Sequence, residues 1–180
     1  SYNMFLLEAE EDGVKYIILR RPEGRKDRFI ESSPGVYSAP SGVFDSLFKD
    51  AQGYYMRTKH GHIYRFNSVG YLSQIIDRNN NQLSLTYDAY GRLIKIADNW
   101  GRDIRFEYSP ENKVIGLKDF TGKFWAYTYA GRNLKTVTTP ATVEFPNGTT
   151  TVYNYSGSRL SSIVDAKGQT YAVIEYDPQN

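Results

Sequence analysis

Apolar and polar residues alternate in short stretches that recur along most of the chain. Each stretch ends on an aromatic residue, and the spacings between successive ends are 21, 21, 21, 26 and 21 residues. The six ends are Phe66, Tyr87, Tyr108, Tyr129, Tyr155 and Tyr176. The residues two positions earlier are apolar: Tyr64, Leu85, Phe106, Tyr127, Tyr153 and Ile174. The residues between these two sets are polar: Arg65, Thr86, Glu107, Thr128, Asn154 and Glu175. A period of two places the apolar set on one face of a strand, so the pattern predicts half-buried β-strands and excludes helices here.

Two kinds of turn separate these stretches. The first kind opens with an aspartate, at Asp77, Asp98, Asp119 and Asp165, and glycine follows the last three after three residues, at Gly101, Gly122 and Gly168. The second kind follows the aromatic residue, as in the segments 67–70 and 88–91, the latter ending at Gly91. Aspartate at the first position can accept bonds from the backbone ahead of it, and glycine tolerates positive φ at the last. Two turns in each repeat leave room for two strands of about six residues. Each repeat is therefore predicted to be one β-hairpin.

Each repeat also carries two apolar residues three positions apart. The five pairs are Leu72/Ile75, Leu93/Ile96, Val114/Leu117, Leu134/Val137 and Leu160/Ile163. A spacing of three places two side chains on opposite faces of a regular strand. The recurrence indicates either a β-bulge or a leading residue that belongs to the turn and folds back over the strand. The sequence leaves both alternatives open.

The regular repeats occupy residues 53–180, and residues 1–52 are expected to form a β lead-in that caps the first repeat. Within the lead-in, the pattern predicts a hairpin of residues 2–8 and 14–19. It then predicts an irregular loop over residues 22–41 with brief strands at Phe29 and Tyr37, and a short helical turn around residues 43–48. The longer fourth interval predicts a loop insertion at residues 138–148, which contain Pro140 and Pro146.

Composition narrows the classes of function. Aromatic residues make up 15% of the chain, with 16 tyrosines, which is typical of β-proteins. The formal net charge of +2 argues against a nucleic-acid binder, whose affinity depends on neutralising phosphates. The chain has no cysteine, which excludes disulfides and thiolate metal sites. No apolar stretch reaches about 18 residues, so membrane insertion is not expected.

The candidate chemical groups are better explained by structure than by catalysis. His60 and His62 flank a turn without a carboxylate pair nearby, so no metal is expected. The turn aspartates would stand two strands apart, about 9.5 Å, which is too far to share an ion. We therefore expect no enzymatic activity and no cofactor. The basic residues Arg20, Arg21, Arg25, Lys26 and Arg28 are interspersed with Glu23 and Asp27, which predicts a solvated loop.

Three aromatic residues of the repeats, Trp125, Tyr127 and Tyr153, have two interpretations. Their rings can form the apolar face that holds neighbouring strands together through cross-strand pairs. The alternative is a ligand-facing platform for a glycan or a receptor. We favour packing, and we keep the carbohydrate- or receptor-binding adhesion module as the alternative function.

Two segments carry a family resemblance. These are Asn67-Ser-Val-Gly-Tyr-Leu72 with Ile75-Ile-Asp77-Arg-Asn-Asn, and Tyr87-Asp-Ala-Tyr-Gly-Arg-Leu93 with Ile96-Ala-Asp98-Asn-Trp-Gly101. They resemble the YD repeat of Rhs proteins, toxin-complex C subunits and teneurins. The resemblance covers about residues 35–177, although the literal Tyr-Asp dipeptide occurs only at residues 87–88 and 176–177.

The resemblance implies an all-β fold of tandem β-hairpins in a curved antiparallel sheet, an open arc of a larger shell. It implies a non-enzymatic structural segment near the start of the repeat array of a bacterial secreted or cell-surface protein. The implied partners are the remaining repeats and a C-terminal effector, a toxin that the shell encloses or carries. Because the chain ends within a repeat, we expect it to be a fragment whose edge strands favour self-association.

Overall fold

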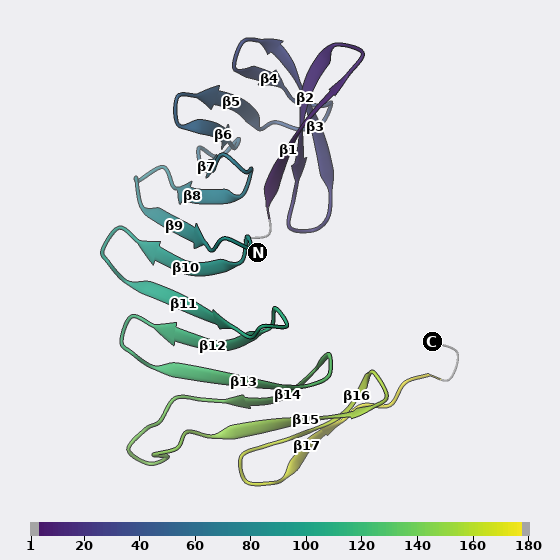
Figure 1. Ribbon diagram of the computed structural model, residues 1–180, viewed down its shortest axis with the longest axis vertical. Coiled ribbons are helices and arrows are strands. Elements are labelled where there is room, and N and C mark those ends of the chain that lie inside the picture. Colours follow the sequence, from purple (N-terminus) through teal and green to yellow (C-terminus); the bar gives the residue numbers. More distant parts are fainter. Residues whose placement is uncertain (1–3, 178–180) are drawn as a thin grey trace. The chain divides into compact units, whose positions relative to one another are not determined.

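A computed structural model describes residues 4–177 of the chain, and every strand in this range belongs to an antiparallel pair (Figure 1). These residues contain 17 strands and no helix, as the alternating pattern predicts. The chain divides into two compact units, Ser1–Gly101 and Arg102–Asn180, which we call the N-terminal unit and the C-terminal unit. The prediction of an all-β fold built from hairpins is confirmed. The boundary predicted between residues 52 and 53 stays a prediction.

The strands follow one another along the chain with short connections. The N-terminal unit contains β1 (Phe5–Glu11), β2 (Val14–Arg20), β3 (Lys26–Ser33), β4 (Val36–Ser38), β5 (Ser46–Asp50), β6 (Gly53–Arg57), β7 (Ile63–Phe66), β8 (Leu72–Ile76), β9 (Gln82–Tyr87) and β10 (Leu93–Asp98). The C-terminal unit contains β11 (Asp103–Tyr108), β12 (Val114–Asp119), β13 (Phe124–Ala130), β14 (Asn133–Thr138), β15 (Thr150–Ser156), β16 (Arg159–Val164) and β17 (Thr170–Val173). Within each unit, every strand pairs with the next one along the chain.

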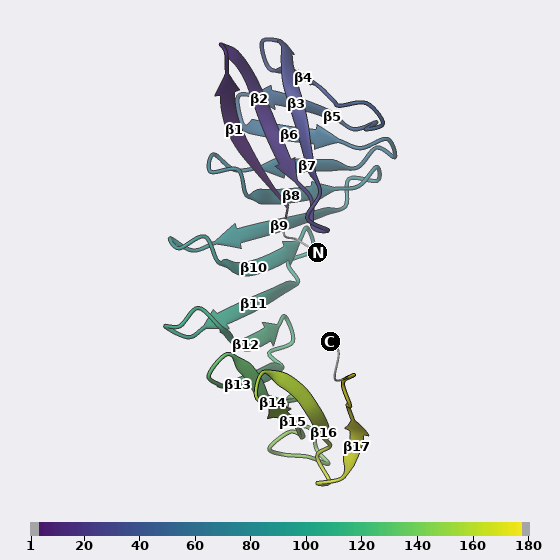
Figure 2. The same cartoon turned by 90° about the vertical axis from the view of Figure 1, so that its right-hand side faces the viewer.

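The lead-in strands cover one face of the first repeats. Figure 2 shows β1, β2 and β3 running across β6–β8. A bridge between Phe5 and Tyr71, and a hydrogen bond of 2.8 Å from the Leu6 N–H to the Gly70 carbonyl, attach the start of β1 to the turn before β8. The lead-in is therefore tied to the repeats by the backbone as well as by packing.

A β-bulge explains the apolar residues spaced by three. In each of the five hairpins, the leading residue of the pair stands opposite the terminal aromatic residue, and one extra residue then shifts the register. The five shifts lie next to the pairs Phe66–Leu72, Tyr87–Leu93, Tyr108–Val114, Tyr129–Leu134 and Tyr155–Leu160. The extra residue returns the second apolar side chain to the face of the first, so Ile75 stands opposite Tyr64 and Leu117 opposite Phe106. Of the two alternatives left open by the sequence, the bulge is the one observed.

The buried core lies in the N-terminal unit. Leu19, Phe29 and Leu47 of the lead-in have 0% exposure, as does Met56 of β6, while Phe66 of β7 has 1%. Full burial of each such side chain stabilises the fold by about 1.5–3 kcal/mol. In residues 102–177, by contrast, Gly116 alone is buried. The lead-in therefore supplies a second layer that the described part of the C-terminal unit does not have.

The lead-in itself is more regular than predicted. The Asp12-Gly13 hairpin forms as expected, although Tyr2 lies outside the described residues. The brief strands expected at Phe29 and Tyr37 are confirmed as β3 and β4, but β3 is longer than expected, with eight residues whose Asp27 and Phe29 alternate inward. The expected helical turn near residue 45 is wrong, because Ser46–Asp50 pairs with β6 as strand β5. The insertion after β14 is a loop, closed by a bond of 2.9 Å from the Thr139 N–H to the Thr149 carbonyl.

Candidate functional site

The apolar face of the C-terminal unit is made by the alternating residues that the sequence singled out. Trp125 stands opposite Leu117, Tyr127 opposite Val137, and Tyr153 opposite Ile163. These three aromatic side chains are half-buried, whereas the intervening Thr128 and Asn154 are exposed. Cross-strand pairs of this kind contribute about 0.2–1 kcal/mol each. The rings therefore act in holding strands together, and their half-exposed faces are open to a further layer.

The corresponding face of the N-terminal unit is covered. On this face, Phe66 of β7 is 1% exposed and Leu85 of β9 is 5% exposed. Strands β1–β3 run across β6–β8 and form the layer over this part of the face (Figure 2). The apolar face of the repeats is thus covered by the lead-in strands in the N-terminal unit and half-exposed in the C-terminal unit.

The terminal tyrosines of the repeats do more than fill this face. The Tyr87 hydroxyl donates a bond of 2.8 Å to the carbonyl oxygen of Leu72, and the Tyr129 hydroxyl donates one of 2.8 Å to that of Val114. Each bond connects a tyrosine to the first strand residue after the preceding aromatic turn, 15 residues earlier. Tyr108 and Tyr155 also close their hairpins, opposite Val114 and Leu160. Tyr176 lies beyond β17 and is 45% exposed.

The turn aspartates bind the backbone of their own turns. Oδ1 of Asp119 accepts the N–H of Thr121 at 2.9 Å and of Lys123 at 3.0 Å, and Oδ1 of Asp165 accepts two equivalent N–H groups. Asp77 follows the same pattern, and Asp98 accepts the Trp100 N–H at 2.9 Å. Gly101, Gly122, Gly168 and Gly91 all have positive φ. Among the described residues, no three His, Cys, Asp or Glu side chains converge as a metal site would require.

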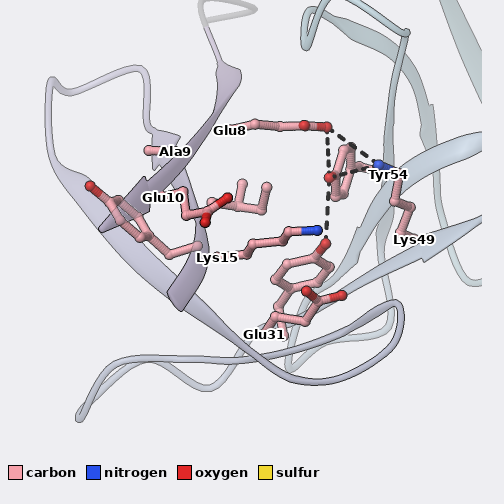
Figure 3. Close-up of a pocket in the computed structure, with 10 residues that line it drawn as sticks. Glu8, Ala9, Glu10, Lys15, Glu31, Lys49 and Tyr54 are labelled. Carbon is pink, nitrogen blue, oxygen red and sulfur yellow. Dashed lines mark hydrogen bonds and ion pairs between the residues drawn. The ribbon is translucent and has the colours of Figure 1, made fainter. Parts of the chain in front are cut away.

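A polar pocket, which no sequence pattern predicted, lies where the lead-in meets β6 (Figure 3). Tyr54 donates a hydrogen bond of 2.7 Å to Oε1 of Glu8, and the ammonium of Lys49 lies 3.0 Å from the Tyr54 hydroxyl and 3.4 Å from Glu8. Tyr37 completes the chain, with its hydroxyl 3.4 Å from that of Tyr54. Residues of β1, β4, β5 and β6 thus meet at one place.

This arrangement shifts the acidity of its members. The hydrogen bond from Tyr54 lowers the pKa of Glu8, because it stabilises the carboxylate, and Lys49 adds to the effect. Burial raises the pKa of Tyr54 to about 12 and also raises the pKa of Tyr37. At neutral pH the pocket therefore holds neutral phenols beside an ionised carboxylate.

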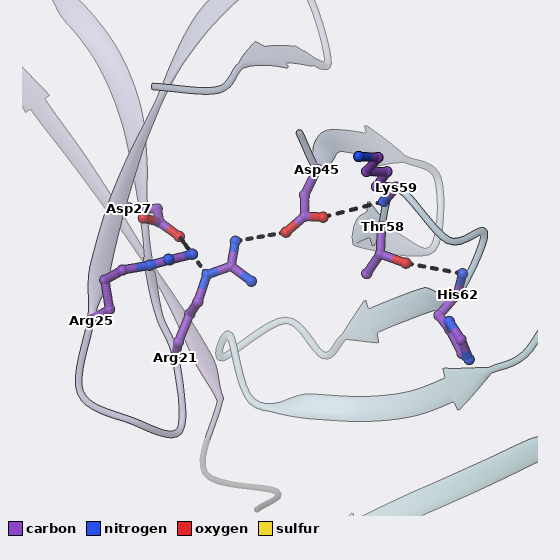
Figure 4. A network of polar contacts seen from close by, with 7 residues as sticks. All are labelled: Arg21, Arg25, Asp27, Asp45, Thr58, Lys59 and His62. Atoms are coloured by element: carbon purple, nitrogen blue, oxygen red, sulfur yellow. Dashed lines mark hydrogen bonds and ion pairs between the residues drawn. The ribbon is translucent and has the colours of Figure 1, made fainter. Parts of the chain in front are cut away.

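A second polar cluster corrects the prediction of a solvated basic loop (Figure 4). Arg21 lies between two carboxylates, contacting Asp27 through Nε and Asp45 at 2.7 Å. Its side chain is 12% exposed and that of Asp27 6%, so this pair is buried. Asp45 also accepts the Lys59 N–H at 3.4 Å. The mixture of basic and acidic residues in the sequence could not predict this buried pair, because only the fold shows which arginine of the segment points inward.

A family model matches the middle of the chain. Residues 46–133 match the model described as Teneurin YD-shell. Tandem hairpins with recurrent bulges define the chain as a β-hairpin repeat protein. More narrowly, the chain belongs to the YD-repeat proteins.

Similar curated proteins and solved structures are much longer than this chain. The tRNA nuclease WapA of Bacillus subtilis (strain 168) is 31% identical over 192 residues, covering 94% of this chain and 8% of that protein. The tRNA3(Ser)-specific nuclease WapA of Bacillus spizizenii has the same identity and coverage. The crystal structure of TcdB2-TccC3 aligns with 91% of this chain and 10% of its own, at 17% identity and a TM-score of 0.48. The crystal structure of TcdB2-TccC3 without the hypervariable C-terminal region aligns with 91% and 9%, at 16% identity and a TM-score of 0.48. The chain thus spans about a tenth or less of these proteins. Separately, the described residues include no helix long and apolar enough to cross a bilayer.

Proposed function

We propose that this chain is the start of a YD-repeat shell in a longer secreted or cell-surface protein, and that the shell encloses a C-terminal effector. The observation that carries the proposal is the contrast between the two apolar faces. Phe66 of β7, on the face that the lead-in crosses, is 1% exposed, whereas Ile104, on the same repeat face in the C-terminal unit, is 39% exposed. An apolar sheet face is stable in water only when another layer covers it. Further repeats and the enclosed effector would supply that layer.

The lead-in has a separate role in this proposal. An array of hairpins has an end where the apolar face would meet solvent, and terminal units of repeat proteins are modified to protect such ends. Strands β1–β3 cover the first repeats of the N-terminal unit and are tied to them through Leu6 and Gly70. They would therefore cap the shell at its first repeats. No enzymatic step is assigned to this segment, and glycan binding by Trp125, Tyr127 or Tyr153 stays a prediction.

Protease protection of the effector tests the proposal in the longer protein. Tyr127→Asp and Tyr153→Asp place charges on the apolar face, whereas Thr128→Asp and Asn154→Asp place the same charges on the adjacent exposed positions. We expect the first pair to speed effector cleavage and the second to leave it unchanged, with circular dichroism confirming strand content. An effector that is cleaved equally fast in the unaltered protein and in all four variants would contradict enclosure.

A further inference from the structure

The pocket lies where the buried core of the lead-in ends. Leu6, Glu8 and Glu10 alternate on one side of β1, and Leu6 is 3% exposed whereas the two glutamates are exposed. On β3, Phe29 and Glu31 repeat this change from a buried apolar residue to a more exposed carboxylate. Two strands thus place carboxylates at one pocket, where a ligand can reach them.

The pocket has the size and the mixed lining of a ligand site. Its volume is about 360 Å³, within the usual range for small-molecule pockets. Its charged residues are Glu8, Glu10, Glu31, Lys15 and Lys49, which sum to a net charge of −1 (two positive, three negative). Tyr37 and Ile17 add a ring and an aliphatic side chain to the lining. This charge disfavours phosphate and other anions, and the described residues provide no trio of metal ligands.

One end of the pocket has hydrogen-bonding capacity to spare. Tyr37 is 7% exposed, and its hydroxyl contacts Tyr54 at 3.4 Å, which is long for a bond between hydroxyls. Glu31 stands directly opposite Tyr37 in the pairing of β3 with β4. Oε1 of Glu31 accepts the Gly35 N–H at 3.2 Å, and its second oxygen has the capacity to accept a further donor. Lys49, at the other end, is already engaged with Glu8 and Tyr54.

We propose that this pocket binds a primary ammonium group on an alkyl chain. The ammonium would donate to the Glu31 carboxylate and to the Tyr37 hydroxyl. The chain would lie along Ile17, which stands opposite Glu8 in the pairing of β1 with β2. The net negative charge favours a single positive charge, and a charge-assisted bond to a carboxylate provides the anchor. The ligand is either a lysine side chain of a partner protein or a small free amine. The site is independent of the enclosed effector, because all its residues belong to the N-terminal unit.

The test measures binding of four probes to the chain by NMR chemical-shift titration. n-Pentylammonium represents a free amine and Nα-acetyl-lysine amide a lysine of a protein chain, while n-pentanol and the Nε-acetylated lysine amide have no charge. We expect both ammonium probes to bind and both uncharged probes to bind at least about tenfold more weakly. Tighter binding of the lysine amide than of pentylammonium would support a partner protein, and equal or weaker binding a free amine.

Two substitutions locate the site. Glu31→Gln should weaken ammonium binding about tenfold, and Tyr37→Phe severalfold, because each removes one group that bonds the ligand. Glu11→Gln is the matched control, since Glu11 of β1 pairs with Arg28 of β3 and does not line the pocket. Absence of ammonium binding, equal binding of uncharged probes, or loss of binding in Glu11→Gln as large as in Glu31→Gln would each overturn the proposal.

Discussion

The hydroxyl of Tyr87 donates a hydrogen bond of 2.8 Å to the carbonyl oxygen of Leu72. Tyr129 and Val114 repeat the relationship with the same distance. In both cases the tyrosine lies at the end of the first strand of one hairpin, and the acceptor begins the second strand of the hairpin before it. In these two repeats the tyrosine side chain thus joins consecutive hairpins.

Removing this hydroxyl should loosen the junction between hairpins. Tyr87→Phe keeps the ring and leaves the carbonyl of the buried Leu72 without its side-chain donor, so we expect a loss of about 1 kcal/mol in the free energy of unfolding. Chemical denaturation measures the change. Tyr90→Phe is the control, because Tyr90 is 84% exposed at the neighbouring turn. Equal effects of the two substitutions would show that the bond does not contribute.

The attachment of the lead-in depends on a glycine. Gly70 has φ +96°, and a Cβ placed there would lie 2.3 Å from the Leu6 carbonyl oxygen. Gly70→Ala should therefore separate β1 from the turn before β8 and destabilise the N-terminal unit by more than about 2 kcal/mol. Gly101→Ala shares the positive φ but meets no atom within 4 Å, so it should cost only the backbone strain of about 1 kcal/mol. Thermal unfolding of both variants makes the comparison, and a larger loss in Gly101→Ala would refute it.

The buried ion cluster should be costly to break. Asp27→Asn removes one of the two carboxylates that contact Arg21 in a region where both side chains are nearly inaccessible. We expect the free energy of unfolding to fall by about 3 kcal/mol, because the buried charge of Arg21 keeps only one of its two carboxylate partners. Asp103→Asn removes the partner of Arg105, whose side chain is 62% exposed, and should change stability far less. Urea unfolding of the two variants provides the test, and equal losses would argue against a special role for the cluster.

Stability should fall in alkaline solution. Burial raises the pKa of Tyr54 and of Tyr87 from 10.0 to about 12. The unfolded chain releases these protons near pH 10 whereas the folded chain retains them, so the free energy of unfolding decreases as pH rises from about 10 to about 12. Below pH 10 this contribution is fully present. Phenolate absorbance during unfolding at several pH values measures the effect. Tyr54→Phe should flatten the decline, and an unchanged slope in that variant would contradict the assignment to Tyr54.

The repeats could be predicted from sequence because each position has one dominant cause. Alternation fixed the faces of strands such as Gln82–Tyr87, and Asp119 with Gly122 marked a turn whose bonds are local. The bulges were visible as a conflict between a spacing of three and a period of two, but choosing an explanation required the partner strand. That choice depends on register, which sequence spacing alone does not determine.

The lead-in could be predicted only in part, for a different reason. Strand β3 contains Lys26, Asp27 and Arg28, which resemble a solvated loop when read in order. Its structure depends on contacts with distant segments, such as the bond of Arg21 to Asp45. The pocket at Glu8 and Tyr54 likewise joins residues 46 positions apart. No local sequence pattern predicts contacts between such distant residues, so neither the Arg21 cluster nor the pocket could be predicted from the sequence.

Cysteine labelling in the longer protein tests the enclosing shell most directly. The chain contains no cysteine, so Tyr127→Cys and Thr128→Cys each introduce one thiol into this segment, on the apolar face and on the exposed face of the same strand. In the intact protein we expect a soluble maleimide to label the cysteine at position 128 readily and the one at position 127 slowly. Deleting the effector should make the two rates approach each other. Equal and rapid labelling of both positions in the intact protein would contradict the account.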